Sequence, residues 1–106
     1  MDPKTGRIRA LNDELRQHLI GGLAVITPGV AALGSEAVER IVKTIAVFDD
    51  FCHENDPYEE HDFGLFEVDG HTLIFKIDLY EEPDVKNPNG GPVVTRVLTI
   101  MLAEEY

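Results

Sequence analysis

The chain has 106 residues, 43% of them apolar, and this length is typical of one compact domain. We therefore expect a single domain over residues 1–106, which is too short to form two lobes around a deep cleft. Twenty acidic residues against nine Lys and Arg give a net charge of −11, which argues against direct binding to nucleic acid. The single cysteine, the charged N-terminal segment and the lack of an apolar run of about 20 residues indicate a soluble, cytoplasmic protein.

The N-terminal part of the chain predicts a helix followed by a strand. Apolar residues at intervals of three and four predict an amphipathic helix over Arg7–Leu19, with Thr5 as a candidate cap. Its expected buried stripe consists of Ile8, Leu11, Leu15 and Leu19. Glycines at 21 and 22 end this helix, and the run Leu23–Thr27 then predicts a short buried strand that stops at Pro28.

A second helix is expected over about Glu36–Cys52, and Ser35 can cap it. Its predicted core face consists of Val38, Ile41, Val42, Ile45 and Ala46, with Phe51 or Cys52 as the last member. The sequence Asn55-Asp56-Pro57 follows and is typical of a turn, because Asn and Asp side chains bond to nearby backbone groups and Pro fixes φ. We expect a loop from this turn to His61.

The remainder of the chain predicts strands. Asp69-Gly70 suits a type I′ turn, so Phe63–Val68 and His71–Tyr80 are expected to form an antiparallel hairpin. The stretch Glu81–Pro92 contains three prolines and predicts a long loop without regular structure. Val93–Ala103 is rich in β-branched residues and predicts a final strand, with a helix over residues 95–106 as the alternative.

These elements together predict an α+β fold. Two helices are expected to pack on a small, mainly antiparallel sheet, because the apolar stripes of the helices and the alternating strands each leave one face to be buried. The sheet is expected to contain the hairpin over residues 63–80, the C-terminal strand and the short strand near residues 23–27.

Charge is distributed unevenly along the chain. Residues 1–48 hold five acidic and six basic residues, residues 49–84 hold thirteen and one, and residues 85–106 hold two of each. This acidic segment, Asp49–Asp84, is either a solvated surface or a docking face for a basic partner. Tyr58 is a candidate anchor because interface hot spots favour large aromatic side chains, whereas Phe63 and Phe66 are expected in the hairpin core. The residues expected to contact a partner are Asp49, Asp50, Glu54, Asp56, Tyr58, Glu59, Glu60, Asp62, Glu67, Asp69, Glu81, Glu82 and Asp84.

A metal site is a second hypothesis for the same segment. Imidazole and carboxylate groups bind Zn²⁺, Mn²⁺ or Fe²⁺, and a turn at residues 55–57 would bring two histidines together. The candidate ligands are His53, Asp56, His61 and Asp62. Their order matches no established metal-binding spacing. In the competing, structural interpretation, His61 and Asp62 bond to backbone groups of the loop and His53 lies exposed at a helix C-terminus.

Other catalytic chemistry has little support in the sequence. It contains no phosphate-binding glycine-rich loop, no Gly-x-Ser-x-Gly elbow and no Cys-x-x-Cys pair. Asp62-Phe63-Gly64 matches a kinase tripeptide, but the other kinase motifs are missing. Cys52 is expected in the core or at its boundary, and His53 is not expected to activate its thiol, because adjacent helical side chains do not face each other. We expect no cofactor and no catalytic residue.

Several separate motifs resemble one protein family across nearly the whole chain. They are Ile8–Asp13, Phe48–Phe51, Asn55–Gly64, Phe75–Asp78 and Arg96–Tyr106. In this order they are similar to domain of unknown function 3768, a family of small alphaproteobacterial proteins. The resemblance implies a bacterial cytosolic protein, and relatives carried on mobile elements would suit a counter-defence role. Glu59 stands where the family pattern leads us to expect a glycine, and the segment before Val93 is shorter than in that pattern.

The expected function is that of a non-enzymatic acidic binding protein. It would be a mobile-element-encoded inhibitor, anti-CRISPR-like or a nucleic-acid mimic, that docks on a basic surface of a nucleic-acid-handling protein. No contact with nucleic acid itself or with a membrane is expected. The alternative is a small metal-dependent enzyme or metal sensor that uses His53 and His61. A third interpretation is an accessory subunit that completes the surface of another protein.

Overall fold

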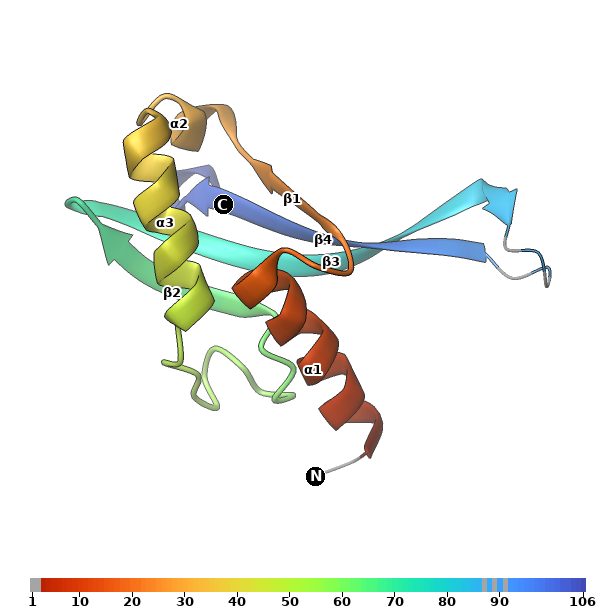
Figure 1. Ribbon diagram of the computed structural model, residues 1–106. Coiled ribbons are helices and arrows are strands. Elements are labelled where there is room, and N and C mark those ends of the chain that lie inside the picture. Colours follow the sequence, from red (N-terminus) through yellow and green to blue (C-terminus); the bar gives the residue numbers. More distant parts are fainter. Residues whose placement is uncertain (1–2, 87, 89, 91) are drawn as a thin grey trace.

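The structure of the protein is a computed structural model that describes residues 3–86, 88, 90 and 92–106 (Figure 1). In chain order its elements are α1 (Pro3–His18), β1 (Leu23–Ile26), α2 (Pro28–Ala31), α3 (Ser35–Val47), β2 (Phe63–Val68), β3 (His71–Lys86), β4 (Pro92–Leu102) and the 3-10 turn η1 (Ala103–Glu105). The strands pair in the order β1-β4-β3-β2. β3 is antiparallel to both of its neighbours, and β1 is parallel to β4. The predicted α+β fold with a mainly antiparallel sheet is confirmed.

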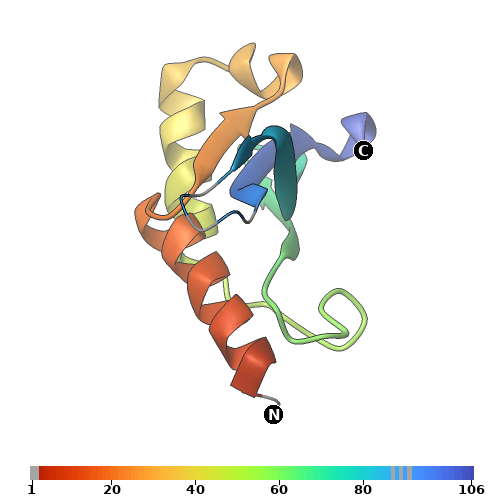
Figure 2. The same ribbon diagram turned by 90° about the vertical axis from the view of Figure 1, so that its right-hand side faces the viewer.

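The helices α1 and α3 cover one face of the sheet, as the two perpendicular views show (Figures 1 and 2). Side chains alternate between the faces of a strand, so every second residue of β3 and β4 points towards these helices. Phe75 of β3 and Leu98 of β4 are fully buried on this side. The core cluster consists of Leu15, Val30, Ile41, Ile45, Phe66, Leu73, Phe75, Ile77, Leu98 and Ile100. The core therefore lies between the sheet and the helices.

The predicted hairpin of β2 and β3 is confirmed. Asp69 and Gly70 have φ values of 54° and 81°, as a type I′ turn requires. In β2, a Cβ atom on Gly64 would lie 2.2 Å from the ring of Phe75 and 2.9 Å from that of Phe48. Glycine is therefore required beneath this aromatic cluster, which also includes Phe66 of the predicted hairpin core.

The predicted buried stripe of α1 is wrong in part. Leu15 is fully buried, but Leu11 and Leu19 are 40% and 49% exposed, while Asn12 and Arg16 are buried. The reason is that α1 packs against irregular backbone whose carbonyl groups, such as those of Phe48 and Glu60, need polar partners. Thr5 is not a cap, because the helix already begins at Pro3.

β1 is a strand as predicted, but it is not buried. Its residues Leu23, Val25 and Ile26 are exposed because β1 is a four-residue strand at the edge of the sheet. The strand ends before Pro28, as predicted. The short helix α2 begins there, with Thr27 Oγ1 accepting a hydrogen bond from the backbone of Val30.

The second predicted helix ends earlier than expected. α3 ends at Val47 and not at Cys52, because Phe48 adopts an extended conformation, and Gly34 takes the N-cap position expected for Ser35. As predicted, Ile41 and Ile45 are buried on its core face.

The predicted loop over residues 81–92 is wrong for residues 81–86, which belong to β3, and for Pro92, which begins β4, while residues 87, 89 and 91 lie outside the described residues. β3 pairs with β4 as far as Lys86 beside Pro92, with an irregular register after Glu82, and the two strands project as an arm from the rest of the molecule (Figure 1). Pro83 is compatible with this arm because it lies where the register is irregular, between Glu82 and Lys86, and Pro92 because it begins its strand. The C-terminal strand prediction is correct and its helical alternative is wrong.

Candidate functional site

The acidic loop, which we define as residues 48–62 between α3 and β2, is attached to one side of α1. Arg9 Nε donates to the carbonyl oxygen of Glu59 at 2.7 Å, and Asn12 Nδ2 donates to that of Glu60 at 2.9 Å. Asp13 Oδ1 lies 2.9 Å from Nδ1 of His61. The residues of α1 that hold the loop are thus polar, and the apolar periodicity of the helix does not reveal them. Their spacing is a signal in the sequence, since positions i, i+3 and i+4 share one helix face.

Arg16 joins α1 to the point where α3 ends and the acidic loop begins. Its Nη1 donates to the carbonyl oxygens of Ile45 at 2.9 Å and Phe48 at 2.8 Å, and its Nε bonds to Asp13 at 2.9 Å. Carbonyl groups at a helix C-terminus lack intrahelical donors and carry partial negative charge. The guanidinium of Arg16 therefore supplies donors to carbonyl groups at this helix end, of which that of Ile45 also accepts from the backbone of Phe48 at 3.3 Å. Its Cζ also lies 5.1 Å from the ring centre of Phe51.

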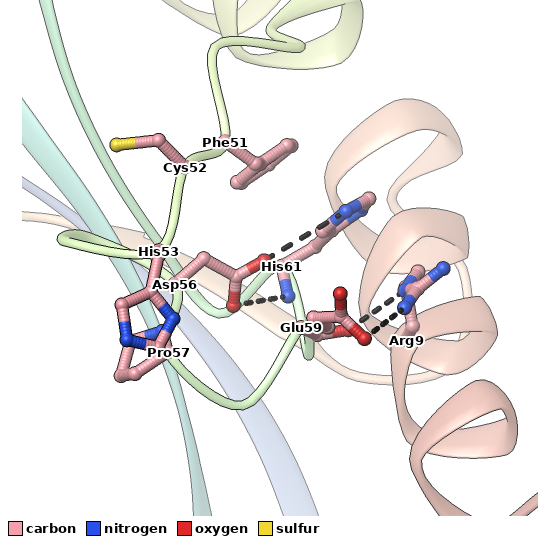
Figure 3. A pocket seen from close by; sticks show the side chains of 8 residues that line it. All are labelled: Arg9, Phe51, Cys52, His53, Asp56, Pro57, Glu59 and His61. Carbon is pink, nitrogen blue, oxygen red and sulfur yellow. Dashed lines mark hydrogen bonds and ion pairs between the residues drawn. The ribbon is translucent and has the colours of Figure 1, made fainter. Parts of the chain in front are cut away.

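Asp56 shapes the acidic loop from within. Its Oδ1 accepts hydrogen bonds from the backbone N–H groups of Glu60 and His61 at 2.9 and 3.1 Å, and its Oδ2 lies 3.8 Å from Nε2 of His61 (Figure 3). Asn55 Oδ1 likewise accepts from the backbone of Cys52 at 3.0 Å. These are the side-chain to backbone bonds expected of a turn. Because Asp56 is only 4% exposed, its charge is used inside the loop and not on the outer surface.

His61 is held between two carboxylates and an aromatic ring. Its imidazole stacks on Phe51 with ring centres 3.8 Å apart and 4° between the planes. Its Nδ1 lies within hydrogen-bond distance of Asp13 Oδ1, at 2.9 Å. The ring of His61 therefore contacts carboxylates and not the backbone groups that the structural interpretation predicts.

The backbone of the acidic loop contains two residues in the left-handed region. Glu59 and His61 have φ values of 58° and 56°. This conformation costs a non-glycine residue roughly 1–2 kcal/mol, and it persists where surrounding contacts hold the chain. A glycine at position 59 would adopt the same φ without strain. The bonds from Arg9, Asn12 and Asp56 supply the contacts that hold the loop in this form.

The acidic loop presents carboxylates and one aromatic ring to solvent. Asp49, Asp50 and Glu54 are exposed, and Tyr58 is 75% exposed. Glu59 is also exposed, but it forms an ion pair with Arg9 at 3.6 Å. The outer surface of the loop therefore carries several carboxylates and the ring of Tyr58.

The other predicted contact residues lie in separate places. Glu67 is exposed in β2, and Asp69 in the hairpin turn binds Arg40 of α3 at 2.6 Å. Glu81 and Glu82 are exposed on the arm at the opposite end of the sheet (Figure 1). The side chain of Asp84 lies outside the described part of the chain. The acidic segment is thus spread over the loop, the hairpin turn and the arm.

Two carboxyl groups at the end of the acidic loop have raised pKa values. Burial raises the pKa of Glu60, and the nearby charges of Asp62 and Asp56 add to this effect. Burial also raises the pKa of Asp62, with further contributions from Asp56 and Asp78. The ionised form of both groups is therefore less stable than that of an ordinary carboxyl group at the surface.

The two histidines of the metal hypothesis do not meet. Their imidazoles lie on opposite sides of Asp56, so the turn at residues 55–57 does not bring His53 and His61 together (Figure 3). Asp62 lines a different pocket. Within residues 3–86, 88, 90 and 92–106, no group of three or more His, Cys, Asp and Glu side chains could hold a metal ion. The metal hypothesis therefore stays a prediction. The expectation that His53 lies at a helix C-terminus is wrong, because α3 ends at Val47.

A pocket of about 260 Å³ opens on the acidic loop. Its lining consists of Arg9, Phe51, Cys52, His53, Asp56, Pro57, Glu59 and His61 (Figure 3). Cys52 is exposed and not in the core as predicted, because it follows the end of α3. Its thiol points away from His61 (Figure 3), so the pocket does not form a thiol–imidazole pair.

Comparison with known sequences places the chain in a family. The sequence model of the family described as "Protein of unknown function (DUF3768)" matches residues 26–105, which is more than half of the chain. The chain belongs to the DUF3768 family. The matched range includes the acidic loop and the sheet, whereas α1, which holds the loop, precedes it. Neither the curated proteins nor the solved structures contain a significant match to the chain. None of the helices in the described ranges is long and apolar enough to cross a membrane.

Proposed function

We propose that this member of the DUF3768 family is a non-enzymatic acidic binding module, which docks on a basic surface of a nucleic-acid-handling protein in the bacterial cytoplasm. The observation that supports this function is the construction of the acidic loop. Irregular segments longer than about 12 residues are uncommon in compact domains unless they are functional or disordered. This loop is held at four points of α1, and it presents Asp49, Asp50, Glu54 and Tyr58 to solvent.

A fixed loop is suited to binding. Ordering a flexible segment on association costs free energy, and a loop that already has one conformation avoids that cost. A charged surface that only maintains solubility needs no such attachment. Tyr58, which is 75% exposed on the acidic loop, has the character of an interface anchor.

The acidic loop indicates the chemistry of the partner. Carboxylates complement a surface rich in Lys and Arg, and surfaces that bind the phosphates of nucleic acid are of this kind. More specifically, we propose that the protein is an inhibitor encoded by a mobile element. It competes with nucleic acid for such a surface, in the manner of an anti-CRISPR protein. The electrostatic share of such binding decreases as salt screens the charges.

The test is a binding experiment with matched charge variants. The immobilised protein is exposed to nuclease-treated lysate of an alphaproteobacterium, and each retained protein is purified and titrated between about 50 and 500 mM salt. In the loop variant, Asp49→Asn, Asp50→Asn and Glu54→Gln are combined. We expect this variant to bind about tenfold or more weakly at low salt, and duplex DNA or RNA to compete with the wild type.

The control removes the same charge elsewhere. Glu14→Gln, Glu39→Gln and Glu104→Gln are combined, because these exposed residues lie outside the acidic segment. This variant is expected to bind within about threefold of the wild type. Equal weakening in both variants, affinity that does not change with salt, or no competition by nucleic acid would contradict the proposed function.

A further inference from the structure

The strand β3 has an edge that no neighbouring strand covers in the described structure. β2 pairs with β3 only from Phe63 beside Lys76 to Val68 beside His71, and the contact ends with Asp62 O accepting from the backbone of Ile77 at 2.9 Å. β3 continues to Lys86 and is paired there only on its other side, with β4. Figure 1 shows β3 and β4 extending past the end of β2. The sheet therefore has room for a further strand beside residues 77–82.

The backbone groups along this edge are oriented for pairing. In an antiparallel ladder, the N–H and C=O of one residue point to the same side, and alternate residues point to opposite sides. Ile77 points its N–H to the side of β2, so Leu79 and Glu81 point theirs to the same, uncovered side. Leu79 is 57% exposed and Glu81 is exposed. An exposed edge of this kind is a template for an added strand.

A small acidic pocket adjoins the same edge. It has a volume of about 270 Å³ and lies between Ile8 of α1, Glu60 and Asp62 of the acidic loop, and Ile77 and Leu79 of β3. This volume is below the range of about 300–1,000 Å³ that is usual for small-molecule sites, so it suits one inserted side chain.

The charges of this pocket favour a cation. Arg96 also lines it, but this guanidinium donates to Asn12 Oδ1, and burial lowers its pKa. Burial destabilises the charged forms of Glu60 and Asp62, and neighbouring carboxylates add to this cost, whereas the charge of Arg96 partly offsets it at Glu60. An entering cation would relieve this cost.

We infer that an extended, basic segment of the partner adds as a strand to β3 beside residues 77–82 and inserts a Lys or Arg side chain between Glu60 and Asp62. This inference rests on the proposed function and names the contact through which the partner binds. Side chains of an added strand alternate between the faces, and those on the face of Ile77 and Leu79 enter the pocket. A second copy of this chain fits the edge poorly, because it would place its own Glu81 and Glu82 beside those of the first.

The experiment uses the full chain and a ten-residue synthetic peptide of alternating lysine and valine. A matched peptide carries N-methyl groups on alternate residues, which keeps the charge but removes the donors needed for strand pairing. Leu79→Pro removes one backbone donor at the uncovered edge and leaves the pairing with β4 intact. Leu79→Ala removes the same side chain and retains the donor. Circular dichroism and thermal melts verify that both variants fold.

The expected result is that Leu79→Pro and N-methylation each weaken binding about tenfold or more, while Leu79→Ala remains within about threefold of the wild type. Combining Glu60→Gln with Asp62→Asn is expected to weaken binding and to reduce its salt dependence. Isotope-edited NMR is expected to place the largest amide shifts at Leu79 and Glu81.

Other results would overturn this inference. Binding that survives both Leu79→Pro and N-methylation but is lost in the Asp49, Asp50 and Glu54 variant would leave the proposed function in place and exclude the β3 edge. No binding of the peptide up to about 1 mM would also exclude it. A dimer of the free protein that Leu79→Pro dissociates would show that a second copy occupies the edge.

Discussion

Asp56 and His61 show how single buried polar residues determine the conformation of the acidic loop. Neither residue is in a helix or strand, yet both polar ends of each side chain have partners. The two oxygens of Asp56 contact the loop backbone and His61, and the two ring nitrogens of His61 lie near Asp13 and Asp56. The sequence predicts the turn at Asp56, because Asp and Pro are typical turn residues. It does not predict that Asp56 is buried, because the loop that encloses it is attached to residues of α1, such as Asn12, more than 40 positions earlier.

Replacing Asp56 by Ala is expected to destabilise the protein. The backbone N–H groups of Glu60 and His61 lose their acceptor, and each buried group without a partner costs about 1–3 kcal/mol. We therefore expect the free energy of unfolding in urea to fall by about 2 kcal/mol or more. Asp56→Asn retains an acceptor oxygen and is expected to lose less.

Glu54→Ala is the control for this measurement, because Glu54 lies in the same loop and is exposed. Its expected effect is within about 0.5 kcal/mol of the wild type. Equal losses for Asp56→Ala and Glu54→Ala would show that Asp56 does not hold the loop.

At the level of elements, the junction of α1, α3 and the acidic loop depends on one guanidinium. Arg16 reaches carbonyl groups that lie 29 and 32 positions further along the chain. Helical periodicity identifies α3 but not its end, because the last carbonyl groups are satisfied by this distant side chain. The same limit applies to β3, where the prolines predict a loop while pairing with β4 continues the strand.

Arg16→Met is expected to lower the free energy of unfolding by about 3 kcal/mol, since it keeps much of the side-chain volume but removes the donor to the carbonyl groups of Ile45 and Phe48 and the ion pair with Asp13. Arg16→Lys keeps the charge but not the forked geometry, and an intermediate loss of about 1–2 kcal/mol is expected. Urea denaturation of both variants gives these values.

Arg7→Met provides the comparison, because Arg7 is an exposed residue of the same helix. It is expected to change stability by no more than about 0.5 kcal/mol. If Arg7→Met destabilised the protein as much as Arg16→Met, the role assigned to Arg16 would be wrong.

On the scale of the whole molecule, stability depends on pH through the acidic groups. The raised pKa values of Glu60 and Asp62 mean that the folded state binds more protons than the unfolded state. This difference operates between the ordinary carboxyl pKa of about 4 and the raised values. In that window stability increases as the pH falls. Glu105 has a lowered pKa and acts in the opposite direction, but only at more acidic pH.

The wild type is therefore expected to gain stability in urea denaturation as the pH falls from 7 towards the ordinary carboxyl pKa of about 4. The Glu60→Gln/Asp62→Asn variant is expected to be more stable than the wild type at pH 7 and to gain less on acidification. Glu14→Gln/Glu39→Gln makes the same change in net charge at exposed positions and is expected to keep the wild-type gain. Identical pH profiles for the two double variants would show that net charge alone sets the dependence.

The sequence by itself determined the features that depend on near neighbours. The Asp69-Gly70 turn, the alternation in β3 and the apolar face of α3 follow from turn preference and side-chain periodicity, which act over a few residues. The excess of acidic residues is likewise a property of composition. Only the tertiary structure decided which of these carboxylates are buried, which face solvent and which edge of β3 stays uncovered. The physical reason is that these properties depend on contacts such as Asp13 with His61, which lie 48 positions apart.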